Sequence, residues 1–200
     1  ALKKQFKGRG LYQSIVFLPW AFSGFVVGLI FRWSFNGEYG VVNNLLMKLG
    51  IIDNNIAWLG TPGYSLAVVI IAMIWMGIPF FAIMILAALQ SIPADVYEAA
   101  DVDGAGKFDC FRYITIPQLK ATVTMTVLTR LVDLLRIFEL PKVLLGGTTP
   151  FLATMSYEEY SYGNNAYSAV ASTVLLALIL VIVMAYMFAF EREKKGGGRR

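Results

Sequence analysis

The sequence contains no histidine, only one cysteine, and few charged residues for its length. A single cysteine cannot form an intrachain disulfide, and zinc sites built from cysteine and histidine need more ligands than the chain has. Histidine is also the side chain that most often transfers protons near neutral pH. These absences exclude an intrachain disulfide, a Cys/His zinc site and histidine-based acid–base catalysis. The one thiol, Cys110, is expected to be half-buried and structural.

The small share of charged residues indicates a membrane protein. Charged residues make up 15% of the sequence and hydrophobic residues 58%, and the mean hydropathy is +0.64. In soluble globular domains about a quarter of the residues are charged. A helix must cross about 30 Å of hydrocarbon to span a bilayer, and four segments are long and apolar enough to do so. We therefore predict an all-α membrane protein, a bundle of transmembrane helices with spans at residues 11–33, 64–89, 117–138 and 167–190.

The positions of the basic residues predict the topology. With both ends and the loop between the second and third spans inside, 12 of the 17 Lys and Arg residues lie on the inner side. They are Lys3, Lys4, Lys7, Arg9, Lys107, Arg112, Lys120, Arg192, Lys194, Lys195, Arg199 and Arg200. We therefore expect both ends to be cytoplasmic. Because the basic residues form no patch with aromatic side chains, the net charge of +4 does not indicate nucleic-acid binding.

The third span differs from the others in its charge. Its uncharged core, residues 121–129, is followed by Arg130, Asp133 and Arg136 at a spacing that puts them on one helical face. Ionisable groups at membrane depth are costly unless they pair or face water, and Arg130 and Asp133 are spaced to pair. Three interpretations stay open: an ion cluster near the outer mouth, direct lining of a solute path, and snorkelling to the membrane surface.

Two features bear on packing and on the outer loop. Gly24 and Gly28 have the spacing that lets another helix approach closely, although glycine is also simply tolerated in membrane helices. Residues 34–63 carry turn signals and form a polar loop. Within this loop, residues 41–49 are apolar enough to form a short interfacial helix.

Residues 91–116 form the one long polar insert between two very apolar segments. Pro93 suits the first turn of a helix, and Asp95 adds negative charge where the helix dipole favours it. Gly104 follows where a chain leaving a helix needs positive φ, and Pro117 is expected to restart a helix. The insert is either a solvated loop with a helical turn or a short helix whose surface suits a partner protein.

The order of residues in this insert resembles a known signature. The run Glu98-Ala99-Ala100, three residues, Gly104, nine residues, then Ile114-Thr115-Ile116-Pro117 is similar to the EAA motif of permease subunits of binding-protein-dependent ABC importers. In that family the motif ends in Ile, one residue and Leu-Pro, so only Ile116 departs from it.

Other segments resemble the carbohydrate-importing, maltose-type branch of that family. The sequences flanking the EAA motif are similar, and the outer loop carries the pattern G-x-x-N-x-L at Gly40, Asn43 and Leu45. A later T-G-G-P pattern is matched only in part, because Thr148 and Thr149 precede Pro150.

The resemblance implies the type I permease fold of ABC importers, with a cytoplasmic coupling helix. It implies a transmembrane permease domain at residues 1–190, with the coupling loop at residues 91–116, and a cytoplasmic tail at residues 191–200. Permeases of this kind have about six spans and the first ten residues show no cleavable signal, so we expect N-terminal helices to be missing from the chain. The residues implied to couple the chain to an ATPase are Tyr97, Glu98, Ala99, Ala100, Asp103, Gly104 and Pro117.

The implied partners are an ABC ATPase subunit dimer, a second permease subunit, an extracytoplasmic solute-binding protein, a carbohydrate solute and the lipid bilayer of the cytoplasmic membrane. The chain itself is expected to bind no cofactor, because a partner subunit hydrolyses the ATP. It lacks a phosphate-binding loop, since Gly106-Lys107 is followed by Phe108 and position 101 is not glycine.

Two other classes stay open. A membrane-bound enzyme would use the acids of the insert as catalysts or oxygen ligands. An ion-coupled transporter or channel-like helical bundle would use Arg130 and Asp133. We expect a permease that is not itself an enzyme. ATP hydrolysis stimulated by an ATPase subunit and a solute-loaded binding protein would separate these classes.

Overall fold

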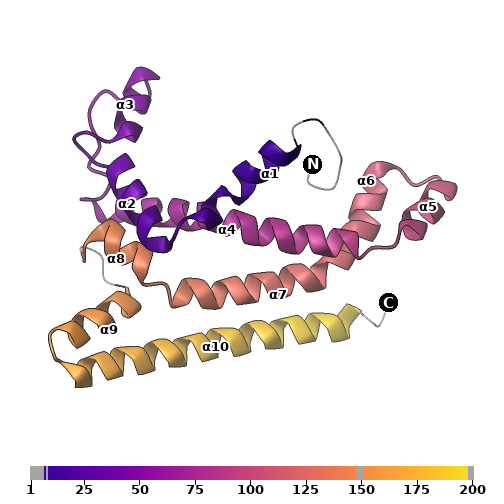
Figure 1. Ribbon diagram of the computed structural model, residues 1–200. Helices are drawn as coiled ribbons and strands as arrows, with labels where there is room; N and C mark the ends of the chain where they lie inside the picture. Colours follow the sequence, from indigo (N-terminus) through magenta and orange to yellow (C-terminus); the bar gives the residue numbers. More distant parts are fainter. Residues whose placement is uncertain (1–6, 8, 148–150, 198–200) are drawn as a thin grey trace.

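The computed structural model describes residues 7, 9–147 and 151–197, with the backbone alone for residue 9 and for residues 191–197. In this part of the chain every regular element is a helix, as the composition predicts (Figure 1). Lys3, Lys4, Thr148, Thr149, Pro150, Arg199 and Arg200 lie outside the described residues. The elements are α1 (Arg9–Phe17), the 3₁₀-helix η1 (Leu18–Ala21), α2 (Gly24–Ser34), α3 (Val41–Lys48), α4 (Pro62–Gln90), α5 (Ala94–Val102), α6 (Lys107–Asp109), the π-helix η2 (Cys110–Thr115), α7 (Ile116–Leu135), α8 (Glu139–Leu145), α9 (Leu152–Ser161) and α10 (Asn165–Gly197).

The long helices α4, α7 and α10 form the body of the molecule (Figure 1). Helix α7 packs against α4 on one side and against α10 on the other. The short helices α2, α3, α8 and α9 gather at one end, and α5 and α6 lie at the opposite end, where α10 also finishes. The insert and the C-terminal end of α10 therefore share one end of the bundle.

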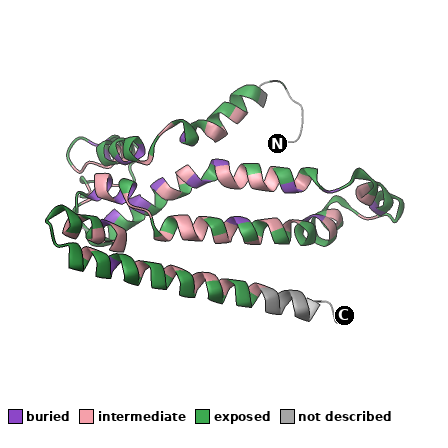
Figure 2. Ribbon diagram, turned by 60° about the horizontal axis from the view of Figure 1, so that its bottom comes forward, coloured by how far each residue is buried: buried purple, intermediate pink, exposed green. Residues whose placement is uncertain are grey.

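The buried core lies at the end opposite to the insert. Aliphatic side chains of α2, α4 and α8 meet there, and aromatic rings such as Phe22 and Trp75, stacked at 6.4 Å, pack around them. By contrast, α10 is exposed along most of its apolar length (Figure 2). An apolar helix with so little burial is suited to lipid or to another protein chain. The buried core residues are Val27, Val68, Val69, Ala72, Leu140, Leu144 and Leu145.

Gly24 and Gly28 form the face of α2 on which α8 packs. A Cβ on Gly28 would lie 2.9 Å from the Cβ of Val143, and a Cβ on Gly24 would lie 3.1 Å from Oε2 of Glu139. The guanidinium of Arg32, one turn further along α2, donates to the Val143 carbonyl at 3.1 Å. The close helix approach that the glycine spacing predicts is therefore confirmed.

The predicted span at residues 11–33 is not one straight helix. Residues 10–21 and 24–34 form two helical pieces that meet at 99°. Pro19 lies in η1 and cannot continue a regular hydrogen-bond ladder. Ser23 then starts a new helix by accepting the Val26 N–H at 3.3 Å. The sequence prediction of a single continuous span is corrected to a bent pair.

The other predicted spans coincide with long helices, but they differ in character. By length and composition, α4 and residues 165–190 of α10 could each cross a membrane, and the bent pair could provide one more crossing among the described residues. Helix α7 is not in this set, since it carries Lys120, Arg130 and Asp133 and ends at Leu135 instead of residue 138. Its crossing of the bilayer stays a prediction.

The loop between α2 and α4 is organised around the buried amide of Asn43. Helix α3 confirms the predicted helix at residues 41–49, and Asn43 within it is 1% exposed. Its side chain donates to the carbonyls of Gly37 and Ile56, both at 3.0 Å, and accepts from Trp58 Nε1 at 2.7 Å. A Cβ on Gly40 would lie 2.3 Å from the Asn36 carbonyl oxygen, so glycine is required there.

Candidate functional site

Helix α5 forms at the position where the sequence of the insert predicts a helix. Pro93 precedes it at the cap position, and Asp95 lies in its first turn. After the helix ends, Gly104 adopts φ +75° and its N–H donates to the Asp101 carbonyl at 3.1 Å. Residues with a side chain adopt this backbone region only with strain. The predicted role of Gly104 as the exit residue of this helix is confirmed.

The residues implied to couple the chain to an ATPase lie on two faces. Those that are exposed are Glu98, Ala99, Asp103, Gly104 and Pro117. Tyr97 is half-buried and Ala100 is 9% exposed. Because residues three apart share a helix face, Tyr97 and Ala100 lie together on the inner face of α5. Only the outer face is available to a partner protein.

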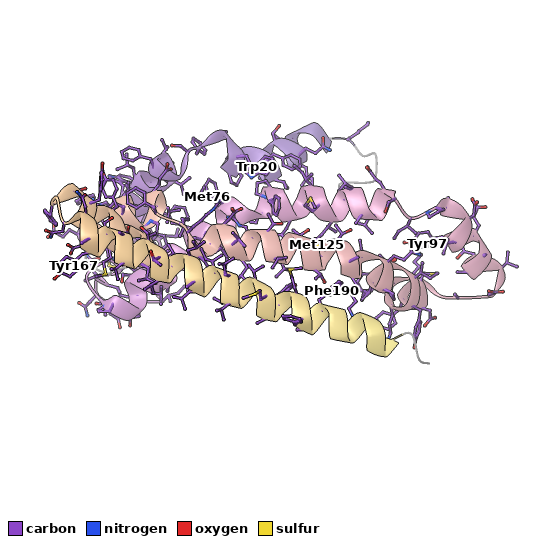
Figure 3. All side chains as sticks on the ribbon, turned by 90° about the horizontal axis from the view of Figure 1, so that it is seen from below. Trp20, Met76, Tyr97, Met125, Tyr167 and Phe190 are labelled. Carbon is purple, nitrogen blue, oxygen red and sulfur yellow. The ribbon has the colours of Figure 1, made fainter. Side chains whose placement is uncertain are left out.

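Tyr97 is bound within its own chain. Its hydroxyl oxygen lies 2.9 Å from Oγ1 of Thr115, which is 8% exposed. The Thr115 hydroxyl also donates to the Cys110 carbonyl at 3.2 Å. Figure 3 marks Tyr97 where α5 meets the rest of the insert. Sequence reasoning missed Thr115, because nothing in the spacing of the chain links it to Tyr97.

The chain between α6 and α7 remains helical without a break. The prediction that Pro117 restarts a helix is therefore corrected, since Pro117 lies near the start of α7 inside a continuous helical run. A proline ring clashes with the carbonyl four residues earlier in a regular α-helix. The wider π turn of η2, in which the Ile116 N–H donates to the Phe111 carbonyl, leaves room for that ring.

The solvent-exposed surface of the insert combines charged and apolar side chains. Val102 is 88% exposed and Phe108 is 71% exposed, close in sequence to the acids of α5. Large apolar side chains beside charged ones are typical of surfaces that bind other proteins. Cys110 is half-buried, as predicted for a structural thiol.

The charged face of α7 does not form the expected cluster. Asp133 pairs with Arg136, with Oδ1 and NH2 2.7 Å apart, and the side chains are 37% and 67% exposed respectively. Arg130 takes no part in this ion pair. The hypothesis that Arg130 pairs with Asp133 is therefore wrong.

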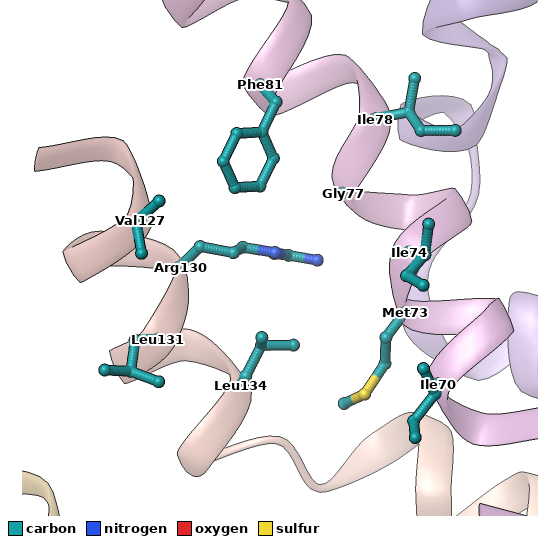
Figure 4. A pocket seen from close by; sticks show the side chains of 10 residues that line it. All are labelled: Ile70, Met73, Ile74, Gly77, Ile78, Phe81, Val127, Arg130, Leu131 and Leu134. Carbon is teal, nitrogen blue, oxygen red and sulfur yellow. The ribbon is translucent and has the colours of Figure 1, made fainter. Parts of the chain in front are cut away.

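Arg130 instead projects into a pocket between α4 and α7 (Figure 4). The pocket has a volume of about 510 Å³, and Arg130 is the charged residue among otherwise apolar walls. A Cβ on Gly77 would lie 3.6 Å from Nε of Arg130, so the guanidinium lies against this position of α4. Within the described residues Arg130 has no ion-pair partner. The lining residues are Ile70, Met73, Ile74, Gly77, Ile78, Phe81, Val127, Arg130, Leu131 and Leu134.

The pocket places Arg130 away from both ends of α4. Gly77 lies near the middle of the 29-residue α4. A cation far from both ends of an apolar helix is costly unless it meets water or an anion. Among the predicted path residues, the structure therefore brings only Arg130 into the pocket and leaves Asp133 and Arg136 together nearer the end of α7.

The acidic residues of the insert remain separate from one another. In the described part of the chain, no three histidine, cysteine, aspartate or glutamate side chains come together in a way that could hold a metal ion. The acids of α5 lie on its exposed side, where water solvates them.

Comparison with known proteins agrees with the arrangement of the bundle and its insert. Residues 1–196 match the family model described as the binding-protein-dependent transport system inner membrane component. The chain belongs to this family. The family consists of multi-pass membrane components of importers, and its fold is the helical permease fold that the EAA motif implies.

Individual relatives of this permease family cover almost the whole chain. The chain is 34% identical over 190 residues to the trehalose/maltose transport system permease protein MalF of Thermococcus litoralis, covering 93% of this chain and 64% of MalF. It is 37% identical over 175 residues to the sulfoquinovosyl glycerol transport system permease protein SmoG of Agrobacterium fabrum, covering 85% of this chain and 56% of SmoG. The chain thus spans less than two thirds of these permeases.

A solved structure shares the permease fold. A bacterial ABC transporter involved in the import of the acidic polysaccharide alginate superposes with a TM-score of 0.78 at 26% identity, over 95% of this chain and 68% of that chain. The predicted fold class is therefore confirmed. Within this permease fold, α5 is the insert between two long helices, α4 and α7.

Proposed function

We propose that this chain is the membrane-spanning permease subunit of an ATP-driven ABC importer for a sugar or related carbohydrate. The observation that carries the proposal is α5, a short polar helix at one end of an apolar bundle that presents Glu98 and Val102 outward. The family to which the chain belongs supports import that depends on a binding protein. The carbohydrate class is supported by the names of the relatives, which refer to trehalose, maltose and sulfoquinovosyl glycerol.

The partners follow from this role. An ATPase subunit dimer hydrolyses ATP and receives α5, so the chain itself binds no cofactor. A second permease subunit completes the path, and the exposed apolar length of α10 supports further contacts with lipid or protein. An extracytoplasmic binding protein delivers the solute to the end of the bundle that carries α2, α3, α8 and α9.

Coupling requires that a movement of α5 reaches the membrane helices. Only residues 91–93 separate α5 from α4, and the run from α6 through η2 to α7 is continuously helical. A short helix seated in a groove of the ATPase can therefore pass a displacement to both α4 and α7. A change in the angle between these two helices would alter the pocket that lies between them.

The path for the solute is proposed to pass this pocket. Arg130 of α7 lines this pocket opposite the middle of α4, and it supplies hydrogen-bond donors in otherwise apolar walls. Asp133 and Arg136, paired with each other, lie further along α7 and are proposed to face the path near its outer mouth.

The insert and both ends of the chain are placed in the cytoplasm on the grounds of basic charge, with residues 191–200 as a cytoplasmic tail.

ATP hydrolysis by the assembled importer tests this function. The full-length permease, its permease partner and the ATPase are reconstituted in lipid vesicles, and the binding protein is added with and without its solute. Mass spectrometry of the ligand that copurifies with the cognate binding protein identifies the solute to use. We expect the solute-loaded binding protein to stimulate hydrolysis and ATP to be required for uptake. Uptake driven by an ion gradient without ATP would instead establish the ion-coupled alternative.

A further inference from the structure

Helix α5 is attached to the bundle through one small contact region. Its main packing partner among the described helices is η2, the π-helix that leads into α7. The chain that follows α5 runs through Gly104 and Gly106, and a Cβ on Gly104 would meet nothing within 4 Å. The hydrogen bonds at this turn, from the Gly104 N–H to the Asp101 carbonyl at 3.1 Å and from the Ala105 N–H to the Ala100 carbonyl at 2.9 Å, both end within α5. These bonds tie the link to α5 itself, so a direct contact between α5 and η2 gives a second route to α7 that bypasses the link.

The hydrogen bond between Tyr97 and Thr115 is that bypass. It joins the middle of α5 directly to the last residue of η2, eighteen positions along the chain. The contact lies on the inner face of α5, where Ala100 is also buried, and away from the face that a partner would meet. A displacement of α5 can thus reach α7 through this hydrogen bond, without passing through the link at Gly104 and Gly106.

The donor and acceptor roles in this contact are fixed by chemistry. The Cys110 carbonyl can only accept, so the Thr115 hydroxyl must donate its one proton there, at 3.2 Å. Thr115 can then only accept from Tyr97, whose hydroxyl must be the donor at 2.9 Å. The chain of bonds runs from Tyr97 through Thr115 to the backbone of the π turn. Tyr97 is thereby tied to the geometry of η2.

We propose that Tyr97 and Thr115 are positioning residues that lock the coupling helix α5 to the start of α7, so that displacement of α5 by the ATPase moves α7. This inference rests on the proposed function of α5. It assigns to Tyr97 a role inside the permease instead of a contact with the ATPase. Loss of the lock leaves docking intact and lets the glycine link absorb part of the movement.

A double-mutant cycle tests the lock in the reconstituted importer. Tyr97→Phe removes only the Tyr97 hydroxyl. Thr115→Val removes, at nearly constant volume, the hydroxyl that accepts from Tyr97 and donates to the Cys110 carbonyl, and Thr115→Ser keeps a hydroxyl. Two quantities are measured: the amount of ATPase bound to the permease, and the ATP hydrolysed per solute transported. Tyr113→Phe is the matched control, because this tyrosine is 70% exposed in the same insert and its hydroxyl has no hydrogen-bond partner among the described residues.

We expect Tyr97→Phe and Thr115→Val each to raise the ATP used per solute by about fivefold, the factor that a typical net hydrogen bond corresponds to. The double variant should be no worse than Thr115→Val alone, since Thr115→Val already removes the bond to Tyr97. ATPase binding, Thr115→Ser and Tyr113→Phe should remain near wild type. Wild-type coupling in Tyr97→Phe, or effects that multiply in the double variant, would overturn the lock. If the wild type shows no stimulated hydrolysis, the proposed function itself fails.

Discussion

The charged residues of α7 show that helical spacing restricts pairing without deciding it. Asp133 stands three residues from Arg130 and three from Arg136, so sequence alone allows either pair. Arg136 lies at the exposed end of α7 and reaches back to Asp133, while Arg130 extends toward Gly77 on α4. The sequence could not connect Gly77 with Arg130, because the contact depends on how two helices pack.

Asp133→Asn is expected to have a small effect on stability. The ion pair with Arg136 is largely exposed, and pairs of that kind contribute at most about 1 kcal/mol. Thermal unfolding of the purified permease in detergent would measure the loss, with Arg136→Gln as the matched partner variant. A loss several times larger that is rescued by Arg130→Gln, and not by Arg136→Gln, would show that Asp133 neutralises Arg130 instead.

At the scale of elements, the buried side chain of Asn43 joins the two sides of the loop between α2 and α4. The resemblance to maltose-type permeases singles out Gly40, Asn43 and Leu45, and the structure gives physical reasons for the first two. The Asn43 side chain forms hydrogen bonds with backbone groups on both sides of the loop. Gly40 lies so close to neighbouring backbone atoms that a Cβ would not fit. Leu45, by contrast, is 56% exposed.

Asn43→Ala is expected to loosen this loop without unfolding the bundle. The change leaves the Ile56 N–H and the Trp58 indole N–H without their acceptor, at a cost of about 3 kcal/mol. Amide hydrogen exchange over residues 36–58 should accelerate by more than tenfold, while α4 keeps its protection. The control is Asn44→Ala, an exposed neighbour with one hydrogen bond to the Gly40 carbonyl. Equal exchange in both variants would contradict the account.

The element boundaries that sequence reasoning missed have local causes. Hydropathy averages over many residues, so residues 11–33 read as one span although Pro19 and Ser23 mark a break within it. The prediction at Pro117 was wrong in the opposite way. The proline was expected to interrupt the helix, but the helix is continuous there. A π turn absorbs the proline ring, and no propensity scale contains such a turn. Long apolar helices such as α4 were predictable within two residues at each end.

At the scale of the whole molecule, the insert and the end of α10 lie together, opposite the loop that carries α3 (Figure 1). The basic residues predict that both segments lie on one side, in the cytoplasm, and that side stays a prediction. The EAA motif made the family predictable from the sequence. The pocket around Arg130 and the lock at Tyr97 were not predictable, since each joins residues from distant segments.

The sidedness can be tested with the one native thiol. In intact spheroplasts, Cys110 should not react with a membrane-impermeant thiol reagent, and it should react after permeabilisation. A Cys110→Ser/Asp53→Cys variant provides the positive control, because Asp53 is exposed in the loop at the opposite end. Reaction of Cys110 from outside would reverse the orientation of the bundle.

The most direct test of the central claim, that α5 docks on an ATPase, compares two glycines. Gly104 has φ +75° and Gly163 has φ +81°, and a Cβ on either would meet nothing within 4 Å. Valine therefore introduces a similar backbone strain, roughly 1–2 kcal/mol, at both positions. Only Gly104 lies beside the outer face of α5.

The measurement is the amount of ATPase subunit that copurifies with the tagged permease from membranes. Gly104→Val is expected to insert in the membrane and to lose the ATPase, because valine distorts the exit of α5 and obstructs docking. Gly163→Val should retain the ATPase at the wild-type level. Equal retention of the ATPase by Gly104→Val and the wild type would contradict the claim that this insert is the coupling surface.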